Sequence, residues 1–258
     1  MIQSASTPEL QTEFLRRIAH KPYFESTLGT HLHLFGNHPA SGWAFYLLPG
    51  SAVLELRGGS AVLCGALPGG EAGEDAREEL TGFLRFLHAD TLRTEHPLTL
   101  PGWQPAAPLT LWELPKGRAL PLPPAPPAEL VPDKAPSMLP VSRLVFAESD
   151  AEFYSAACTA LAHGVGTCRA LLHNGRPVCT VGCYEQSDTE SYMAAGVTDP
   201  AWQGRGLARY LIVGLANELT AERAVRFACF PALCGFYAQL GFLQIGKIQH
   251  YTTDWNTT

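Results

Sequence analysis

One short segment has the residue types of an anion-binding turn, namely Gln203-Gly204-Arg205-Gly206-Leu207-Ala208. A strand is expected to end at Val197, and a leucine-rich helix is expected to begin at Gly206. The first backbone N–H groups of a helix have no intrahelical acceptor, and the helix dipole adds partial positive charge there. Glycines let phosphate oxygens approach the backbone, and Arg205 adds a full positive charge. The segment therefore predicts a phosphate-binding turn.

Two common phosphate-binding motifs do not describe this turn. No Gly-Lys-Ser/Thr sequence closes it, as a P-loop would require. A dinucleotide fingerprint needs three spaced glycines early in a β-α-β unit, and this turn offers Gly204 and Gly206. The pattern resembles instead the signature of the GNAT acetyltransferase family, Gln/Arg-x-x-Gly-x-Gly/Ala. Gln203, Gly206 and Ala208 occupy its three specified positions.

A second sequence element supports the same resemblance. About thirty residues downstream, Phe236-Tyr237-Ala238-Gln239-Leu240-Gly241-Phe242 resembles the closing Tyr-x-x-Leu-Gly-Phe element of the GNAT family. The expected order of strands and helices is also similar from about Val141 to the end, a little under half of the chain. The resemblance implies a GNAT acyl-CoA N-acyltransferase fold in the C-terminal half, with acetyl-CoA as co-substrate.

The resemblance also implies roles for particular residues. In such folds the strand at Ala195-Gly196-Val197 splays from the strand at Val225–Phe230, and pantetheine lies in the gap. The backbone amide near Val197 would face the thioester carbonyl and stabilise the developing oxyanion. The pyrophosphate would lie on the amides of the turn, and Tyr237 would protonate the departing CoA thiolate. The implied cofactor-binding residues are Ala195, Gly196, Val197, Gln203, Gly204, Arg205, Gly206, Leu207 and Ala208.

One family position is altered, and two roles stay open. Many GNAT proteins carry an Asn seven residues before the Tyr, where this chain has Phe230, so that contact with the cofactor is in doubt. Tyr237 has an alternative role as an amphipathic core aromatic. The general base is not fixed either, because each candidate is as readily a solvated side chain. The candidates are Glu185, Asp188, Glu190, Asp199, His163, His173 and His250.

The elements that must position these residues follow from local patterns. Ser149 with Glu152 forms a capping-box pattern, which predicts a helix through Leu161. The Asn174-Gly175 pair predicts a tight turn, because both positions tolerate positive φ. Gly241 is expected to end a short helix. The other expected elements are strands at 168–173, 177–184, 191–197, 225–230 and 242–250, and helices at 206–221 and 233–240.

The N-terminal half shows a weaker version of the same order. Thr7 and Pro8 predict a helix start. A hairpin is expected at Ala52–Leu56 and Ala61–Leu67, with Gly58-Gly59 as its turn, followed by a helix over Asp75–His88 and strands near Leu92 and Leu109–Leu114. Aligning Gly58-Gly59 with Asn174-Gly175 favours a diverged GNAT-like repeat, although two unrelated hairpins would look alike. Acidic residues around the helix start would repel a pyrophosphate, so no second CoA site is expected. These residues are Glu71, Glu74, Asp75, Glu78 and Glu79.

A change in composition along the chain indicates the domain organisation. A proline-rich stretch from Pro115 to Pro140 predicts an extended linker. The expected organisation is an N-terminal α+β domain at 1–114, the linker at 115–140 and a GNAT domain at 141–258. The resemblance and the expected order of elements imply an α+β fold class with a mixed sheet.

Charge, hydropathy and cysteine content limit the classes of partner and compartment. The net charge of −6 argues against nucleic acid as the main partner. No apolar run reaches the roughly 20 residues of a membrane span, and Met1–Thr7 lacks the pattern of a signal peptide. Seven cysteines without a secretory signal favour reduced thiols in the cytoplasm. Cys179 and Cys183 share one face of a strand, without the further ligands of a zinc site, so no metal is expected.

These features predict an N-acetyltransferase that moves an acetyl group from acetyl-CoA to a primary amine. A small amine, an amino acid, an antibiotic, a protein N-terminus or a lysine are equally compatible acceptors. Two alternatives stay open. One is a non-catalytic acyl-CoA sensor, and the other is a structural protein whose N-terminal half and linker recruit partners without binding CoA.

Overall fold

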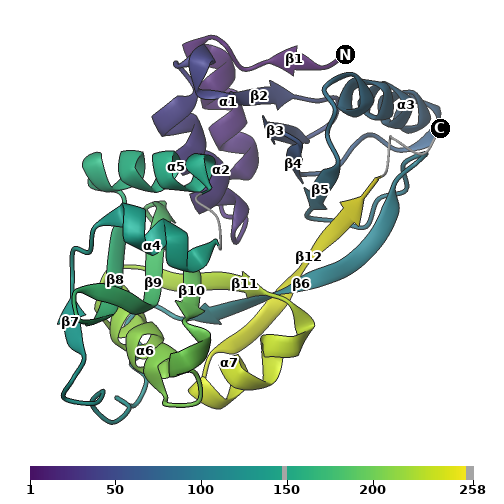
Figure 1. Ribbon diagram of the computed structural model, residues 1–258. Helices are drawn as coiled ribbons and strands as arrows, with labels where there is room; N and C mark the ends of the chain where they lie inside the picture. The colour runs from purple at the N-terminus through teal and green to yellow at the C-terminus, as the bar shows by residue number, and fades with distance from the viewer. Residues whose placement is uncertain (147–149, 254–258) are drawn as a thin grey trace. The chain divides into compact units, whose positions relative to one another are not determined.

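The computed structural model describes residues 1–146 and 150–253 and divides the chain into two compact units (Figure 1). Unit 1 contains Met1–Leu111, Ala228–Cys234 and the chain from Ile245 onward, and unit 2 contains Trp112–Phe227 and Gly235–Gln244. This division follows contacts, whereas the predicted domain boundaries follow chain order. The two differ most after residue 227, and the predicted boundaries stay a prediction.

Unit 1 is a mixed sheet with three helices. Its helices are α1 (Pro8–Ile18), α2 (Phe24–Phe35) and α3 (Gly70–Phe86), with a 3-10 turn η1 (Pro39–Ser41). Its strands are β1 (Gln3–Ser4), β2 (Trp43–Leu47), β3 (Val53–Arg57), β4 (Ser60–Cys64) and β5 (Thr91–Thr94), joined by the end of β12 (Leu243–Thr252). The strand order is β1-β2-β3-β4-β5-β12, and only the β4–β5 pair is parallel.

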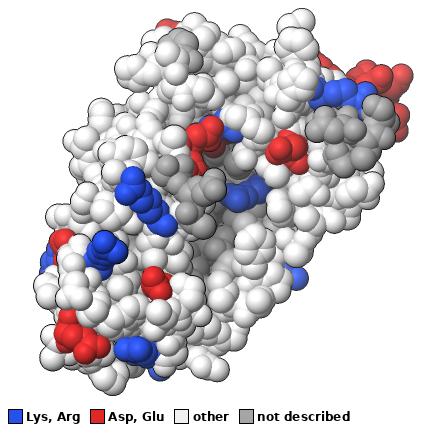
Figure 2. Space-filling model, viewed as in Figure 1, with Lys and Arg blue, Asp and Glu red and all other residues white. Residues whose placement is uncertain are grey.

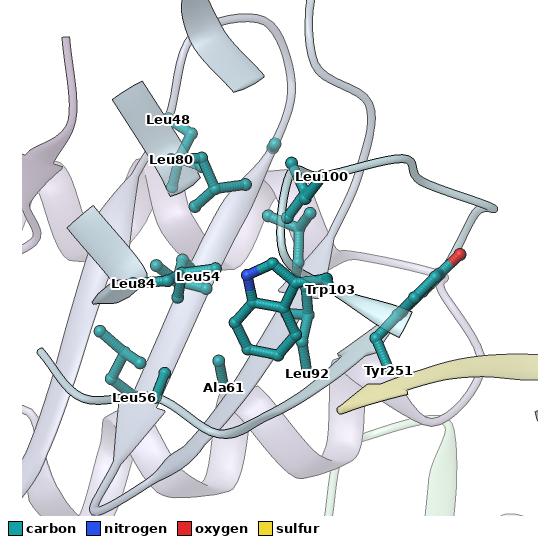
Figure 3. Packing of buried hydrophobic residues seen from close by; sticks show 13 residues of the cluster. Leu48, Leu54, Leu56, Ala61, Leu80, Leu84, Leu92, Leu100, Trp103 and Tyr251 are labelled. Carbon is teal, nitrogen blue, oxygen red and sulfur yellow. The ribbon is translucent and has the colours of Figure 1, made fainter. Parts of the chain in front are cut away.

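Local signals and burial explain the formation of unit 1. The side chain of Thr7 accepts a hydrogen bond from the N–H of Leu10 and Pro8 occupies the first turn, so the predicted start of α1 is confirmed. Phe14 and Ile18 are the buried positions of α1. A separate cluster of leucines from the strands packs with α3 and with Trp103 and Tyr251 (Figure 3). Burial of this apolar surface is the main stabilising contribution to the sheet.

Unit 2 contains another group of paired strands, with its own helices. The helices are α4 (Met138–Val145), α5 (Ala151–Ala162), α6 (Leu207–Leu219) and most of α7 (Cys234–Leu240), with the 3-10 turn η2 (Pro200–Trp202). The 3-10 turn η3 (Pro231–Leu233), which precedes α7, belongs to unit 1. The strands are β7 (Val131–Asp133), β8 (Thr167–His173), β9 (Arg176–Gln186), β10 (Glu190–Thr198) and β11 (Ala224–Cys229). Their order is β11-β10-β9-β8-β7, and only β10–β11 is parallel. The division between the units falls within β6 (Gln104–Leu114), β11 and β12.

Most predicted elements of the C-terminal half are confirmed within one to three residues. Asn174 and Gly175 have φ of 50° and 75° and join β8 to β9, as the hairpin signal predicted. Gly241, with φ of 98°, follows α7. Ser149 of the predicted capping box lies outside the described residues. Asp150 instead caps α5, because its Oδ1 accepts the N–H groups of Glu152 and Phe153, each at 2.9 Å.

The two halves of the chain share one order of elements, in which three antiparallel strands lead to a helix and a parallel strand. The order is β2-β3-β4-α3-β5 in unit 1 and β8-β9-β10-α6-β11 in unit 2. The predicted alignment of Gly58-Gly59 with Asn174-Gly175 is wrong by one hairpin. Gly58-Gly59 joins the second and third strands of its set, so its counterpart is the turn between Gln186 and Glu190. The error arose because β2 was not predicted.

The proline-rich stretch is attached to unit 2 by hydrogen bonds. Asn217 of α6 accepts the N–H of Leu120 at 2.8 Å and donates to the carbonyl of Leu120 at 2.9 Å. Leu120 and Leu130 are buried, and the stretch ends in β7 and the first residues of α4. Extended backbone is what the prolines favour, and α6 provides the surface that holds it.

None of the helices within the described residues combines the length and the apolar character that crossing a membrane requires.

Candidate functional site

A β-bulge interrupts β10 directly before the glycine-containing turn. Ala194 pairs with Gly182 and Val197 with Thr180, so Ala195 and Gly196 together face a single residue of β9. Ala195 has φ of 54°, which is uncommon for a residue other than glycine. Bulges redirect the strand that contains them. The three residues predicted to line the cofactor gap, Ala195-Gly196-Val197, therefore include the bulge and its first neighbour.

The parallel ladder between β10 and β11 ends before this bulge. Its pairs are Glu190↔Ala224, Ser191↔Val225 and Tyr192↔Arg226. In the part of the chain that the structure describes, β10 has no further pair with β11 beyond Tyr192. A strand edge without a partner can accept an extended ligand by main-chain hydrogen bonds. The segment Met193–Val197 thus has one edge available for such a ligand.

The turn after β10 leads into α6 through two glycines in the left-handed region. Gly204 has φ of 75°, and Gly206 has φ of 76° as the N-cap of α6. A side-chain carbon at either glycine would meet nothing within 4 Å, so these residues are required for their backbone conformation and not for space. Gln203 through Gly206 are exposed, and Leu207 is buried beneath them. The turn therefore offers accessible main-chain N–H groups at a helix start.

Side chains on either side brace the turn. The Nε2 of Gln203 donates to the carbonyl of Thr198 at 3.1 Å, which closes the turn onto the end of β10. The ring of Trp202 lies 4.7 Å from the ring of His173, and the guanidinium of Arg205 lies 4.6 Å from the Trp202 ring on a cation–π contact. The sequence pattern of the turn did not predict that Trp202 and His173 contact it. The aromatic next to the glycines was the available signal.

Two arginines place positive charge at the start of α6. Arg205 and Arg209 are both exposed, and Arg209 reaches the carbonyl of Gln239 at 3.5 Å. Arg205 also lies 3.8 Å from Glu129, an ion pair that solvent weakens because both side chains are about half exposed. Arg209 was not predicted as a site residue. Together these charges favour an anion at the first turn of α6.

Tyr237 lies on α7 within a group of aromatic rings. Its ring centroid is 4.2 Å from that of Phe227, 6.5 Å from that of Trp112 and 6.2 Å from that of Phe242. The residue is partly exposed, whereas Trp112, Phe227 and Phe242 are buried. Aromatic packing therefore fixes the ring and leaves part of the side chain accessible. Its role as an acid stays a prediction.

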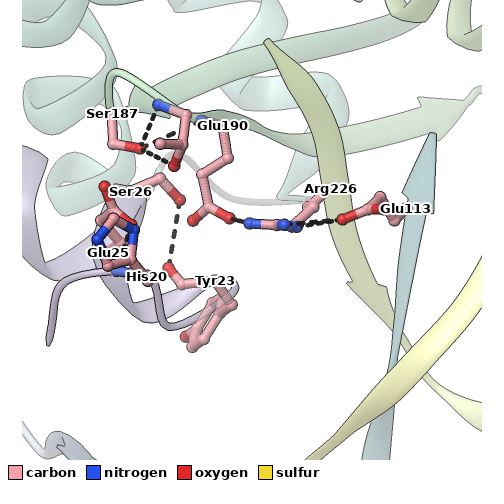
Figure 4. Close-up of polar contacts among 9 residues, drawn as sticks. His20, Tyr23, Glu25, Ser26, Glu113, Ser187, Glu190 and Arg226 are labelled. Carbon is pink, nitrogen blue, oxygen red and sulfur yellow. Dashed lines mark hydrogen bonds and ion pairs between the residues drawn. The ribbon is translucent and has the colours of Figure 1, made fainter. Parts of the chain in front are cut away.

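The carboxylates proposed as bases differ in their surroundings. Glu190 is fully buried and forms an ion pair with Arg226, whose guanidinium also binds Glu113 at 2.7 Å (Figure 4). Burial opposes the charged form of Arg226, but the two carboxylates outweigh it and raise the pKa of this guanidinium. Asp199 caps η2 by accepting the N–H of Ala201 at 2.8 Å. Both groups therefore have structural roles, and Asp188 is exposed.

The histidines and cysteines offer no further catalytic cluster. His163 is exposed at the end of α5, and His250 lies on β12 of unit 1, where burial and Arg93 lower the pKa of its imidazole. Burial raises the pKa of Cys179 to about 11 and that of Cys183 to about 12. These thiols therefore stay protonated at neutral pH. Within residues 1–146 and 150–253, no group of three or more His, Cys, Asp or Glu side chains is arranged to hold a metal ion.

Comparison with known proteins identifies this arrangement. Residues 139–242 match the acetyltransferase (GNAT) family. The GNAT segment includes the bulge, the turn, α6 and Tyr237, so the predicted resemblance is confirmed over these residues. No curated protein sequence matches the chain.

Solved structures extend the fold likeness beyond the GNAT segment. A tandem GNAT protein from the clavulanic acid biosynthesis pathway has a TM-score of 0.67 and 16% identity, covering 100% of this chain and 99% of that one. A GCN5-related N-acetyltransferase from Sphaerobacter thermophilus has a TM-score of 0.63 and 12% identity, covering 97% and 94%. One from Kribbella flavida has a TM-score of 0.58 and 16% identity, covering 80% and 88%. The α+β prediction with a GNAT-like N-terminal half is therefore confirmed at the level of the fold, and the GNAT segment supports acyl transfer from an acyl-CoA.

Proposed function

We propose that unit 2 is an N-acetyltransferase that moves the acetyl group of acetyl-CoA to a primary amine. The observation that carries this proposal is the sequence of three features along one strand and helix. The β10–β11 ladder ends at Tyr192, a bulge follows at Ala195-Gly196, and the left-handed Gly206 starts α6. A strand edge, a bulge and a helix start in series suit a long ligand with an extended arm and a phosphate group.

Each part of acetyl-CoA has a proposed binding element. The pyrophosphate would accept hydrogen bonds from the main-chain N–H groups of Gly204 to Ala208, with Arg205 and Gln203 beside it. The pantetheine arm would lie along Ala195-Gly196-Val197. The amide near Val197 would donate to the thioester carbonyl and stabilise the oxyanion. No metal takes part in this scheme, because an amine can attack a thioester without a Lewis acid.

The proposed reaction is a direct transfer in a ternary complex. The amine nitrogen attacks the acetyl carbon, the new C–N bond forms, and the C–S bond breaks. Tyr237 would give its phenolic proton to the leaving thiolate, whose parent thiol has a reference pKa of about 8.5 against about 10 for the phenol. The nitrogen loses one proton as the amide forms, and this proton returns through water to the Tyr237 phenolate, so the step balances. Glu190 is unsuited to receive that proton, because it is buried in its ion pair with Arg226.

The decisive experiment is a mass-spectrometric screen of amine acceptors with isotope-labelled acetyl-CoA. We expect one class of primary amine to gain the labelled acetyl group while CoA thiol is released in equal amount. Failure of every amine class, combined with tight CoA binding, would contradict the enzyme and leave an acyl-CoA sensor. The altered position Phe230, exposed at the start of η3, is the observation that favours the sensor.

Cofactor stoichiometry tests the assignment to unit 2 alone. Isothermal titration calorimetry with CoA should give about one site per chain, because the exposed carboxylates at the start of α3 in unit 1 would repel a pyrophosphate. Two sites per chain would contradict this assignment. We further propose a cytoplasmic location, since all seven cysteines are free thiols, and no nucleic acid partner, since the net charge is −6.

A further inference from the structure

Unit 1 has a cavity of about 190 Å³ at the place where β4 and β5 end. Leu63, Leu67 and Leu98 provide apolar walls, and Arg77 of α3 and His96 provide polar ones. The exposed Ala66 lies at its surface. A volume of this size is below the roughly 300 Å³ at which sites for drug-sized ligands begin. The cavity therefore suits a molecule much smaller than a nucleotide cofactor.

Next to this cavity, a side chain of unit 1 binds the main-chain amide that follows β4. The carboxylate of Glu95 accepts the N–H of Gly65 at 2.9 Å and pairs with the ammonium of Lys21 at 2.5 Å. Burial opposes the charged form of Glu95, but Lys21 and the Gly65 amide outweigh it and lower the pKa of this carboxyl. The amide at the end of β4 is thus already occupied, and the charge of Glu95 is already compensated.

Arg77 is the charged group of the cavity that has no compensating partner among residues 1–146 and 150–253. It is half-buried, and its guanidinium folds back toward the start of α3, where Nη1 lies 3.4 Å from the place of a Cβ on Gly73. The acidic residues of this helix are exposed and gather on its outer surface (Figure 2). A partly buried guanidinium beside apolar walls gains most from a planar anion that accepts two hydrogen bonds.

We propose that this cavity binds a short-chain monocarboxylate. The carboxylate would lie against Arg77, within reach of His96, and the alkyl chain would lie against Leu63, Leu67 and Leu98. Phosphate fits less well, because most of the lining residues are apolar and burying a second negative charge near Glu95 is costly. The site is separate from the acetyl-CoA site proposed for unit 2 and does not depend on it.

A binding titration with butanoate, followed by ligand-observed NMR in the presence of saturating CoA, tests the proposal. We expect one butanoate per chain. Arg77→Gln should weaken binding about tenfold or more, because a charge-assisted pair is lost. Arg85→Gln, which changes the same kind of residue in the last turn of α3 away from the cavity, should leave binding unchanged.

A second variant tests the cavity independently of charge. Ala66→Phe places a ring in the cavity from an exposed position, so the fold should be kept and butanoate binding lost. Butylamine, with the same number of carbons and the opposite charge, should not bind. The proposal is overturned by absence of butanoate binding, by equal binding of butylamine, by preference for inorganic phosphate, or by binding that neither Arg77→Gln nor Ala66→Phe reduces.

Discussion

The strand–turn–helix regions of the two units have the same element order and different ends. In unit 2 the parallel ladder stops at Tyr192↔Arg226, and β10 continues past a bulge into an exposed glycine turn. In unit 1 the ladder runs to Leu63↔Thr94, and the N–H of Glu95 donates to the carbonyl of Leu63 beyond it. The Glu95 carboxylate then occupies the amide of Gly65. In unit 2 the parallel ladder ends before the bulge, whereas in unit 1 main-chain groups beyond the ladder form internal hydrogen bonds.

The starts of the helices α3 and α6 also differ, in the charge of the side chains around them. The helix α6 begins with two exposed arginines, whereas α3 begins among exposed carboxylates. Carboxylates stabilise a helix N-terminus as internal counter-charges, and arginines there raise its affinity for an external anion. The same element order thus surrounds the helix start with carboxylates in unit 1 and with exposed glycines and arginines in unit 2.

The largest expected effect is on turnover. Tyr237→Phe keeps the ring contacts with Phe227 but removes the hydroxyl, so kcat should fall on the order of 10²–10⁴-fold. The KM for acetyl-CoA should change little, because the proton is needed only as the C–S bond breaks. Tyr46→Phe in unit 1, a matched loss of a partly buried phenol, should leave kcat unchanged. Steady-state kinetics decides, and an unchanged kcat in Tyr237→Phe would remove this residue from the mechanism.

The next largest effect is on stability, through two ion clusters of different burial. Arg226→Met removes the guanidinium that compensates the charge of the fully buried Glu190 and should cost about 3–5 kcal/mol of unfolding free energy. Lys21→Met in unit 1 removes a partner from the more exposed Glu95 and should cost about 1 kcal/mol. Urea denaturation of both variants measures the difference. Equal costs would mean that burial does not distinguish the two clusters.

The rise in Tm that CoA produces distinguishes the start of α6 from the start of α3. Gly206→Val should abolish the rise in Tm that CoA produces, a stabilisation of about 2.7 kcal/mol at a hundredfold excess over Kd. Gly70→Val is the matched control, because Gly70 starts α3 with φ of 64° and has equal space for a side chain. Both variants carry the same backbone strain. The CoA shift should survive in Gly70→Val alone, and a normal shift in folded Gly206→Val would contradict the pyrophosphate assignment.

The smallest effect compares two helix caps. Asp150→Ala removes two hydrogen bonds of 2.9 Å at the start of α5 and should cost about 1 kcal/mol. Thr7→Ala removes one of 3.4 Å at the start of α1 and should cost less. Thermal denaturation followed by circular dichroism measures both. A larger loss for Thr7→Ala would show that cap geometry does not set these energies.

Signals carried by single residues allowed the turn and its neighbours to be predicted. Asn174-Gly175 and Gly206 need positive φ, and that requirement is local to the chain. Two elements whose sequences lack a clear apolar periodicity, β2 and α2, were not predicted. The strand β2 has the sequence Trp-Ala-Phe-Tyr-Leu without alternation, and α2 buries Ser26, Thr27 and Thr30. Both patterns hide the periodicity on which such predictions depend.

Contacts between distant residues could not be predicted from one sequence. Glu113, Glu190 and Arg226 form one ion cluster from three strands, and nothing in their local sequences pairs them. The same holds for Glu95, which lies thirty positions from Gly65. The contact between the tilted rings of His173 and Trp202 joins a hairpin end to the turn, and only the strand order brings them together.

The placement of β12 has a consequence for the protein during its synthesis. Gln249 pairs with Thr94 and Thr252 with Thr91. The strand β5 of unit 1 therefore pairs with residues that the ribosome adds after all of unit 2. Until then the nascent chain presents an unpaired edge at β5, and Tyr251 is missing from the leucine-rich core. Such late, long-range closure is slow. We expect the ribosome-bound N-terminal half to rely on chaperones, whereas the strands and helix from β8 to β11 can assemble as soon as they emerge.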